Sequence, residues 1–452
     1  MTSNEKAPAR SNQERSTQPI SEKSPVAVSF GRSGDGGQQR ATPLKKPARA
    51  IALYLPQFHP VPENDVWWGK GFTEWTNTAK AKPMFRGHYQ PHIPADLGFY
   101  DLRVAETREA QAAMARSYGI EGFCYYHYWF AGRRILQRPF NEVLRSGAPD
   151  FPFCLCWANA TWSGIWYGEP KRILIKQTYP GSADHEAHFR ELLPAFADPR
   201  YIRVEGKPLF LIFRPNELPN SAAALELWRA MAVDAGLGGL HIVGMSWSSD
   251  WNPMADGFDA AVVHPYLPPR MWVSHRHNPL RWARNKLEVW RGRPAIEPYV
   301  TFAKRQLPNA TPNYPWYPCL IHAWDNTPRS GVNGVVLKDA TPELFRGVLH
   351  NAIDLLQDRP PERRILFLKA WNEWAEGNHL EPDLKFGTPL LGSRRRGARF
   401  DAGGAGIIGV RRRADRNLRA VPRAPSRKGV SSAPKRQDPT PGLHVRQSGR
   451  RE

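Results

Sequence analysis

The sequence predicts an α/β fold built as a single (β/α)8 barrel of the TIM type, with disordered extensions at both ends. Eight short apolar runs alternate with segments that are mostly of helical spacing. The runs are continuously apolar, which is typical of parallel strands buried on both faces. Polar and aromatic residues follow the runs directly, and active sites of this barrel lie at the carboxyl ends of its strands. A doubly wound open sheet is the alternative, but no Gly-rich phosphate loop follows the first run.

The eight predicted strands share a length of three to seven residues and an apolar composition. They are Ile51–Leu55, Ile120–Tyr126, Phe153–Trp157, Pro208–Phe213, Leu240–Met245, Ala260–Val263, Cys319–Ile321 and a last strand that begins at Ile365.

The predicted helices occupy most of the connections between these strands. They are Leu102–Tyr118, Phe140–Leu144, His185–Phe196, Ala222–Ala235, residues 280–290 and Pro342–Leu356. The connection from Pro56 to about Tyr100 is predicted instead as one long polar and aromatic loop. A loop of that length inside a compact domain is usually functional.

The charge distribution sets the predicted domain boundaries. The formal net charge of +21 is concentrated at the ends, with 9 basic against 4 acidic residues in 1–50 and 17 against 4 in 391–452. The middle of the chain is almost balanced and holds all 17 Trp residues. We therefore expect a disordered extension over 1–48, one barrel domain over 49–388, and a disordered Arg- and Pro-rich tail over 389–452. The high isoelectric point is therefore due to the basic residues at the two ends of the chain. It gives no reason to expect a specific nucleic-acid partner for the folded domain.

The sequence also predicts the compartment. No secretory signal peptide is visible in the first fifty residues, and no stretch is long and apolar enough to span a bilayer. Each of the four cysteines lies inside an apolar segment, and no His accompanies them at the spacing of a zinc site. We expect reduced core cysteines and a cytoplasmic location, with peripheral attachment to the inner membrane left open. The oligomeric state cannot be predicted.

The segment from Ile365 to Pro382 is the strongest functional signal. Its first half reads as a buried strand, and its second half places Glu373 and Glu376 between Trp371, Trp374 and a glycine. Chemistry on a glycosidic bond needs one carboxyl to donate a proton and another to act as base or nucleophile. The alternative is a helix N-terminus, where acidic residues are favoured by the helix dipole alone.

If the barrel is correct, residues at the ends of successive strands should share one mouth. Aromatic faces suit the apolar faces of sugar rings, and amide, imidazole and carboxylate groups suit hydroxyls. Gln57 and the two catalytic candidates are expected there, together with these substrate-binding candidates: Tyr54, His59, Glu74, Trp75, His127, Trp129, Trp157, Asn159, His264, Tyr266, Trp324, Asp325, Asn372 and Trp374.

Two other chemistries use the same types of residue. Histidines from four strands, His59, His127, His264 and His322, could build a metal site, but no His-Glu-x-x-His pattern is present. A Ser-His-Asp triad would need a nucleophile elbow, and no Gly-x-Ser-x-Gly segment occurs. We expect no metal and no cofactor.

Several long segments resemble the WbsX-type family, whose domain is similar to glycoside hydrolase family 99. The resemblance covers roughly residues 50–388 and rests on residues 54–60, 67–77, 87–91, 122–129, 206–210 and 371–382. It implies a (β/α)8 barrel that acts on a bacterial surface polysaccharide of the O-antigen or lipopolysaccharide type. The closing segment is similar to the one that carries two catalytic glutamates in family 99 endo-α-mannosidases.

By that resemblance Glu373 is the base that deprotonates the sugar 2-hydroxyl, and Glu376 is the acid/base. The sequence departs from the family patterns at Ala375, where the mannosidases have His, and at Ala160, where a cleft carboxylate is expected. After Gly387 the family continues into a terminal helix, whereas this chain becomes rich in Arg and Pro.

Four functions remain open from the sequence, and one of them is binding of nucleic acid through the basic tail, which a steep salt dependence of binding would support. The other three concern the barrel. The first is an enzyme that cleaves or transfers glycosidic bonds, and the second is a nucleotide-sugar-dependent glycosyltransferase in polysaccharide biosynthesis. The third is a catalytically inactive glycan-binding barrel, which Ala160 would favour. The sugar, its linkage and the direction of the reaction cannot be predicted.

Overall fold

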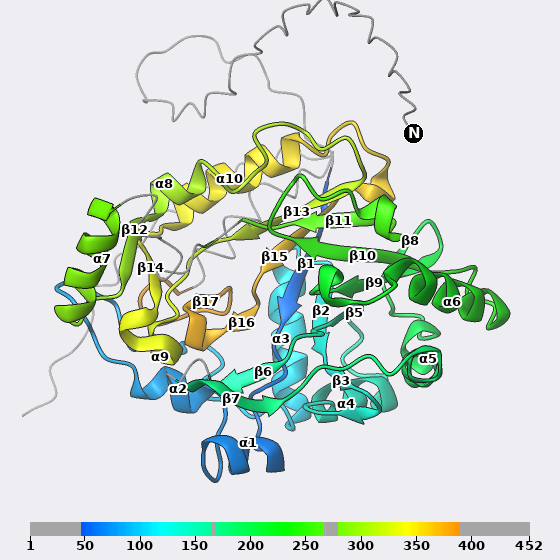
Figure 1. Cartoon of the computed structure of the whole chain (residues 1–452), viewed down its shortest axis with the longest axis horizontal. Coiled ribbons are helices and arrows are strands. Elements are labelled where there is room, and N and C mark those ends of the chain that lie inside the picture. The colour runs from blue at the N-terminus through cyan, green and yellow to red at the C-terminus, as the bar shows by residue number, and fades with distance from the viewer. Residues whose placement is uncertain (1–46, 165–168, 266, 268–278, 388–452) are drawn as a thin grey trace, which may run out of the picture. The chain divides into compact units, whose positions relative to one another are not determined.

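The computed structural model describes residues 47–164, 169–265, 267 and 279–387 (Figure 1). Its centre is a barrel of eight parallel strands. In chain order they are β1 (Arg49–Tyr54), β2 (Gly122–His127), β5 (Phe153–Trp157), β9 (Lys207–Ile212), β10 (His241–Ser246), β11 (Ala260–Val263), β13 (Trp316–Ile321) and β15 (Ile365–Lys369).

These strands pair in the order β10-β11-β13-β15-β1-β2-β5-β9, and pairing of β9 with β10 closes the ring. β1 lies between the last strand and the second, with Ile51 opposite both Phe367 and Gly122. Every residue of β2, β5, β10, β11 and β13 is buried. The predicted (β/α)8 barrel is confirmed, and each of the eight predicted strands overlaps one strand of the barrel.

The helices that cover the barrel are also those predicted, with ends displaced by up to three residues. They are α3 (Ala105–Ser117), α4 (Arg138–Ser146), α5 (Ser182–Phe196), α6 (Ser221–Asp234), α7 (Pro279–Trp290) and α10 (Pro342–Asp354).

The segment between β1 and α3 departs from the prediction of a continuous loop. It contains two helices of seven residues, α1 (Pro62–Trp68) and α2 (Glu74–Lys80). Thr73 caps α2, because its side chain accepts a hydrogen bond from the backbone N–H of Trp75. Two turns are too short to display a helical period in the sequence, so this prediction was wrong in detail.

Small elements without a predicted counterpart follow the carboxyl ends of the barrel strands. They are the hairpins β3 (Trp129–Phe130) with β4 (Arg133–Arg134), β6 (Trp162–Gly164) with β7 (Glu169–Ile175) and β16 (Asn372–Glu373) with β17 (Asn378–His379), the parallel pair β12 (Ala295–Pro298) with β14 (Val335–Lys338), the helices α8 (Tyr299–Ala303) and α9 (Thr327–Ser330), and the 3-10 turns η2 (Pro215–Glu217), η3 (Pro253–Asp256), η5 (Gly331–Asn333) and η7 (Trp374–Glu376). β8 (Arg203–Val204) precedes β9, and the turn η6 (Pro361–Arg363) precedes β15.

Side chains along each barrel strand alternate between the barrel interior and the layer beneath the helices. Cys156 lies inside, where its Sγ is 3.9 Å from the Sδ of Met245 on the non-adjacent strand β10. Phe153, on the same strand, points outward and packs on Phe140 of α4. All four cysteines are buried and form no disulfide, as predicted. Within the described residues, no helix combines the length and apolar character needed to cross a membrane.

Candidate active site

One buried arginine collects three carboxylates at the mouth of the barrel. Arg329 lies in α9, which follows β13, and its side chain is only 4% exposed. Its Nη1 is 2.6 Å from Glu376 Oε1, its Nη2 is 2.9 Å from Glu373 Oε2, and its Nε is 3.1 Å from Glu74 Oε2. Glu74 comes from α2, so the first loop and the last strand of the barrel meet at this guanidinium.

The negative charge at this cluster exceeds the positive charge of the arginine, and the pKa values respond. Burial raises the pKa of Glu373 to about 7, and the nearby charge of Glu376 acts in the same direction, against Arg329 and Lys369. Burial also raises the pKa of Glu74. For Arg329 burial acts to lower the pKa, but the three carboxylates outweigh it and hold the group cationic. The cluster can therefore carry a protonated and an ionised carboxyl together near neutral pH.

Glu376 is the carboxylate that faces the opening. Every other residue from Trp371 to Asp383 is buried, whereas the Glu376 side chain is 14% exposed. The turn after it is completed by Gly377, which has a φ of +56°. A Cβ on this glycine would lie 2.8 Å from the Cβ of Asp325, so only glycine allows this close approach.

Aromatic and cationic side chains form the walls around Glu373. Burial raises the pKa values of Tyr126 and Tyr128 well above the ordinary value, and the charge of Glu373 is the next cause for both. Lys369, at the end of β15, places its Nζ 4.9 Å from the ring centre of Trp324. Burial lowers the pKa of His264 to about 3, with the charge of Lys369 as a further cause. The predicted residues Trp324 and His264 thus share the mouth with the glutamates.

Trp247 extends this wall outward. Its ring is 36% exposed and lies 4.8 Å, centre to centre, from the ring of His264. The guanidinium of Arg214 stacks over the same indole at 4.5 Å. An exposed indole beside buried polar groups is a surface on which a sugar ring can stack.

Three predicted residues support the closing segment from behind. The side-chain amide of Asn372 accepts from the Leu55 N–H at 2.8 Å and donates to the Leu55 carbonyl at 3.0 Å. Trp374 Nε1 donates to Glu381 at 2.6 Å, and its ring contacts Trp75 at 5.4 Å between centres. Asn372 and Trp374 are almost fully buried, so they position Glu373 and Glu376 and do not reach the opening.

Asp325 plays a similar supporting part. Its Oδ2 lies 2.6 Å from His88 Nε2 and accepts from Gln90 Nε2 at 2.7 Å, while Oδ1 accepts from the hydroxyl of Thr327. Burial acts to raise the pKa of Asp325, but these hydrogen bonds outweigh burial and leave the pKa lowered. The ionised Asp325 fixes the start of α9 and thereby the position of Arg329.

Four predicted binding residues point away from the mouth, which corrects the expectation that all strand-end residues converge there. Tyr54 donates to Gln111 of α3 at 2.7 Å, and Trp129 donates to Asp184 of α5. The other two contact helices of the same outer layer: His127 lies 2.9 Å from His188 of α5, and Trp157 packs on Trp228 of α6. The reason is the two-residue alternation of a strand, which turns Tyr126 inward and His127 outward.

The remaining predicted residues are buried connectors. His59 lies 3.1 Å from the carbonyl of Pro56, and the carbonyl of Gln57 accepts from the N–H of Glu74. Asn159 joins the ends of β5 and β9, because its side chain bonds both the N–H and the carbonyl of Arg214. Tyr266 lies outside the described residues.

Five further residues belong to the mouth but were not predicted from the sequence: Arg329, Tyr126, Tyr128, Lys369 and Trp247. Arg329 carries no motif, but it could have been found by asking what neutralises two buried glutamates. Tyr126 and Tyr128 could have been found from their alternation with His127 and Trp129.

Among the described residues, one group has ligand atoms close enough to hold a metal ion: His92, His379 and Asp383. These atoms already have partners, since His92 Nδ1 lies 2.8 Å from His379 Nε2 and Asp383 accepts two backbone N–H groups. The expectation that the protein needs no metal stays a prediction.

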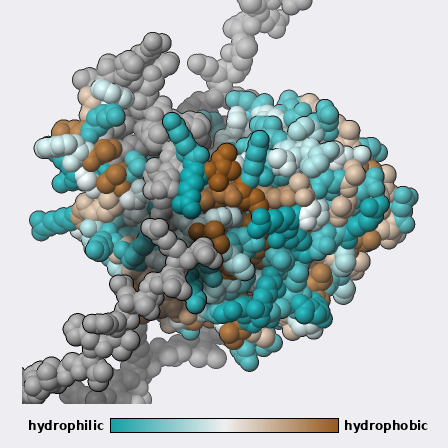
Figure 2. Space-filling model, turned by 60° about the horizontal axis from the view of Figure 1, so that its bottom comes forward, coloured by the Kyte–Doolittle hydropathy of each residue, from teal (hydrophilic) through white to brown (hydrophobic). Residues whose placement is uncertain are grey.

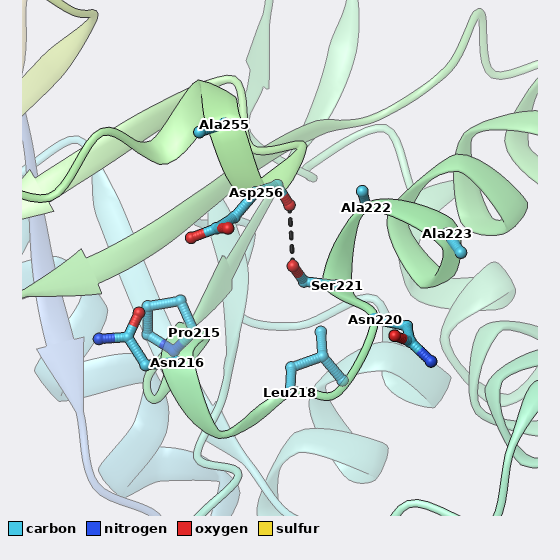
Figure 3. Close-up of a pocket in the computed structure, with 9 residues that line it drawn as sticks. All are labelled: Pro215, Asn216, Leu218, Asn220, Ser221, Ala222, Ala223, Ala255 and Asp256. Carbon is cyan, nitrogen blue, oxygen red and sulfur yellow. Dashed lines mark hydrogen bonds between the residues drawn. The ribbon is translucent and has the colours of Figure 1, made fainter. Parts of the chain in front are cut away.

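A separate shallow pocket of about 630 Å³ lies between η2, the start of α6 and η3 (Figure 3). The hydroxyl of Ser221 donates to the carbonyl of Asp256 across it at 2.9 Å. Asp256 in turn accepts from Trp251 Nε1, so its carboxylate has a structural partner. Glu74, Glu373 and Glu376 do not line this pocket.

Comparison with known proteins identifies the family of this chain. Residues 50–393 match the family described as "Glycosyltransferase WbsX". The protein WxcX of Xanthomonas campestris pv. campestris, described as uncharacterized, is 39% identical over 360 residues, which is 78% of this chain and 50% of WxcX. The same protein of strain B100 is also 39% identical, over 357 residues. The chain thus spans about half the length of these relatives.

Two solved structures resemble the fold more distantly. A glycoside hydrolase-like protein has a TM-score of 0.49 at 14% identity, over 81% of this chain and 98% of that one. The GH99 endo-alpha-mannosidase from Bacteroides thetaiotaomicron has a TM-score of 0.45 at 13% identity, over 77% and 95%. Likeness at this level carries no information on the reaction. The match over three quarters of the sequence does establish one relation: this chain belongs to the WbsX glycosyltransferase family.

Proposed function

We propose that this protein is a carbohydrate-active enzyme that cleaves or transfers glycosidic bonds of a bacterial surface polysaccharide, with Glu373 and Glu376 as the reacting carboxyls. The observation that supports it is the shared guanidinium of Arg329. It holds both glutamates at the barrel mouth, and one of them has a pKa of about 7. A carboxyl with such a pKa exchanges a proton efficiently at neutral pH.

The two glutamates have different surroundings, which suits different roles. Glu373 is buried among Tyr126, Tyr128 and Lys369, so it can take the proton of a sugar 2-hydroxyl as that oxygen attacks the anomeric carbon. Glu376 is closer to solvent. It can donate its proton to the leaving oxygen as the glycosidic bond breaks. In the second step Glu376 takes a proton from the water or acceptor hydroxyl that attacks the anomeric carbon, the bond from that carbon to the 2-oxygen breaks, and Glu373 returns its proton to the 2-oxygen. Trp247 and Trp324 would hold the neighbouring sugar rings.

A second candidate is a nucleotide-sugar-dependent glycosyltransferase, which the description of the family favours. In that reaction the two glutamates would activate an acceptor hydroxyl, and the leaving group would be a nucleotide. A third candidate is a glycan-binding barrel without catalysis, for which Ala160 is the supporting residue.

A product screen by mass spectrometry separates these candidates. Wild type, Glu373→Gln and Glu376→Gln are incubated with α-linked mannan and rhamnan oligosaccharides, with and without nucleotide sugars. We expect shortened or rearranged glycans from wild type, independent of nucleotide, and their loss in both variants.

The matched control is Glu226→Gln, an exposed glutamate of α6 whose side chain is 78% exposed, and it should behave as wild type. Extension that requires a nucleotide sugar would establish the second candidate. Binding of a glycan by wild type without any product would leave the third.

A further inference from the structure

Helix α7 exposes large apolar side chains to solvent. Trp290 is 82% exposed, Leu287 and Trp282 are 42% and 41% exposed, and Val289 is 36% exposed. Trp290 lies three residues after Leu287, so the two side chains stand on one face of the helix. Figure 2 shows hydrophobic side chains at the left edge of the molecule, the edge at which α7 lies in Figure 1. Isolated exposed apolar residues are common, but several on one short helix mark a binding surface.

The charge of the same segment is strongly positive. Residues 279–293 contain five basic residues and one acidic residue, Glu288, which gives a formal charge of +4. Glu288 is itself paired with Arg291 at 3.2 Å and with Arg293 at 3.7 Å. A helix that combines exposed Trp and Leu with an excess of Arg and Lys has the composition of a segment that lies in a membrane interface.

We infer that α7 docks this protein on an anionic lipid surface, with Leu287 and Trp290 inserted between the lipids, and with Lys286, Arg291 and Arg293 against the headgroups. The charge favours this occupant over a second copy of the chain, since two segments with a formal charge of +4 on chains of +21 repel each other. Burial of the two side chains supplies the apolar part of the binding.

The position of α7 connects this surface to the barrel mouth. After α7 the chain enters β12, which pairs with β14. β14 in turn lies against the mouth, because the N–H of Leu337 donates to the carbonyl of Trp324 at 2.8 Å and Val336 bridges to Asp325. Docking through α7 would therefore hold the mouth beside the membrane, where a glycan carried on a lipid could enter it.

Vesicle co-sedimentation of the full-length protein tests the inference. Vesicles of phosphatidylcholine alone are compared with vesicles that contain phosphatidylglycerol, at two salt concentrations. We expect wild type to bind the anionic vesicles, and the double variant Leu287→Ser with Trp290→Ser to bind about tenfold more weakly or less. The control is Val233→Ser with Leu355→Ser, which changes exposed apolar residues in α6 and directly after α10 and should bind as wild type.

Equal binding by the α7 variant and wild type would overturn the inference, because the basic ends of the chain would then account for the binding. Absence of binding by wild type would also overturn it. A dimer in solution that the α7 variant dissociates would assign the surface to a second copy.

A second measurement does not depend on the stability of the serine variants. All four native cysteines are buried, so a polarity-sensitive dye can be attached selectively to Trp290→Cys. Its emission should shift to the blue on anionic vesicles and stay unchanged on neutral ones. An emission that does not respond to anionic vesicles would contradict insertion of α7.

Discussion

Two buried polar clusters of this barrel differ in how their charge is balanced. At the mouth, three carboxylates share the single guanidinium of Arg329, so opposite charges do not cancel. Beneath α5, His127 and His188 contact each other among Trp129 and Trp157, and burial lowers both pKa values well below the ordinary value. Both histidines are therefore neutral, and that cluster carries no charge.

The difference supports the proposal that the mouth is the reactive cluster and the histidine pair a structural one. A neutral hydrogen-bonded pair inside an aromatic layer stabilises one packing arrangement and has no tendency to exchange protons. At the mouth, three carboxylates with one arginine keep a proton shared between them near neutral pH, and one of them, Glu376, faces solvent. Burying such an excess of acidic groups lowers the stability of the fold, and sites of this kind are typically functional. Substitutions at the mouth should therefore reduce activity as well as stability, whereas substitutions in the histidine pair should reduce stability alone.

The largest effect is expected for Arg329→Met. Removal of one partner from a buried ion pair costs about 3–5 kcal/mol, and here three carboxylates lose the same cation. Urea denaturation should show this loss at pH 7 and a smaller loss at pH 5, because protonation relieves the repulsion. Activity should disappear. Arg329→Lys retains the charge but not the planar fork, so it should restore most of the stability but little of the activity. An Arg329→Met variant with wild-type turnover would contradict the proposed roles.

The second prediction concerns the pH dependence of the proposed reaction. Because the pKa of Glu373 is raised to about 7 by burial, a rate that needs ionised Glu373 should rise as the pH increases through about 7. Glu373→Gln should lower the rate by about 10²–10⁴-fold and abolish this limb of the profile. If the limb persists in the variant at a reduced rate, another group provides it.

The third prediction concerns stability and uses a buried glutamate outside the mouth. Burial raises the pKa of Glu381 to about 7, although Trp374, Gln111 and Tyr100 donate hydrogen bonds to it. The folded chain binds this proton more tightly than the unfolded chain. The stabilisation is thus complete below about pH 4.5 and is lost as the pH rises through about 7.

Its measurement is the difference in unfolding free energy between wild type and Glu381→Gln as a function of pH. Wild type should lose stability relative to the variant by up to about 1.4 kcal/mol for each pH unit in that window. The comparison also cancels the histidines, whose lowered pKa values have the opposite sign of effect. A difference that is constant between pH 4.5 and 7.5 would show that Glu381 is ionised throughout.

The smallest effect on activity is expected for a substitution in the His127–His188 pair beneath α5. His188→Phe preserves the stacking on Trp129 but removes the contact with His127, which should cost about 1–3 kcal/mol of stability. Turnover should stay within about twofold of wild type, since a neutral structural pair supplies no proton to the reaction. A pH-rate profile altered by His188→Phe would remove the distinction between the two clusters.

The sequence was sufficient for the barrel because the strands are long enough to show as apolar runs and their order closes a ring. It was also sufficient to place Glu373 and Glu376 at the mouth, because they stand in an unusual Trp-rich segment; their catalytic role stays a prediction. The sequence did not predict the orientation of residues such as His127 and Trp157. The end of a strand determines where the backbone of a residue lies, but not whether its side chain points into the barrel or toward the helices. Arg329 was missed since its four-residue helix has no period and its partners lie up to 255 residues away.

The distance in sequence between Glu74 and the closing segment affects how the barrel is completed during synthesis. Glu74 leaves the ribosome roughly 300 residues before Glu373, which corresponds to about 15–60 s of synthesis. During this time the loop that carries Glu74 and Trp75 has neither the arginine nor the closing segment to pack against. It is then an exposed acidic and tryptophan-rich segment that chaperones can bind. Catalytic competence would arise in a single late step, once Glu376 has emerged and the nascent barrel closes on its own beginning.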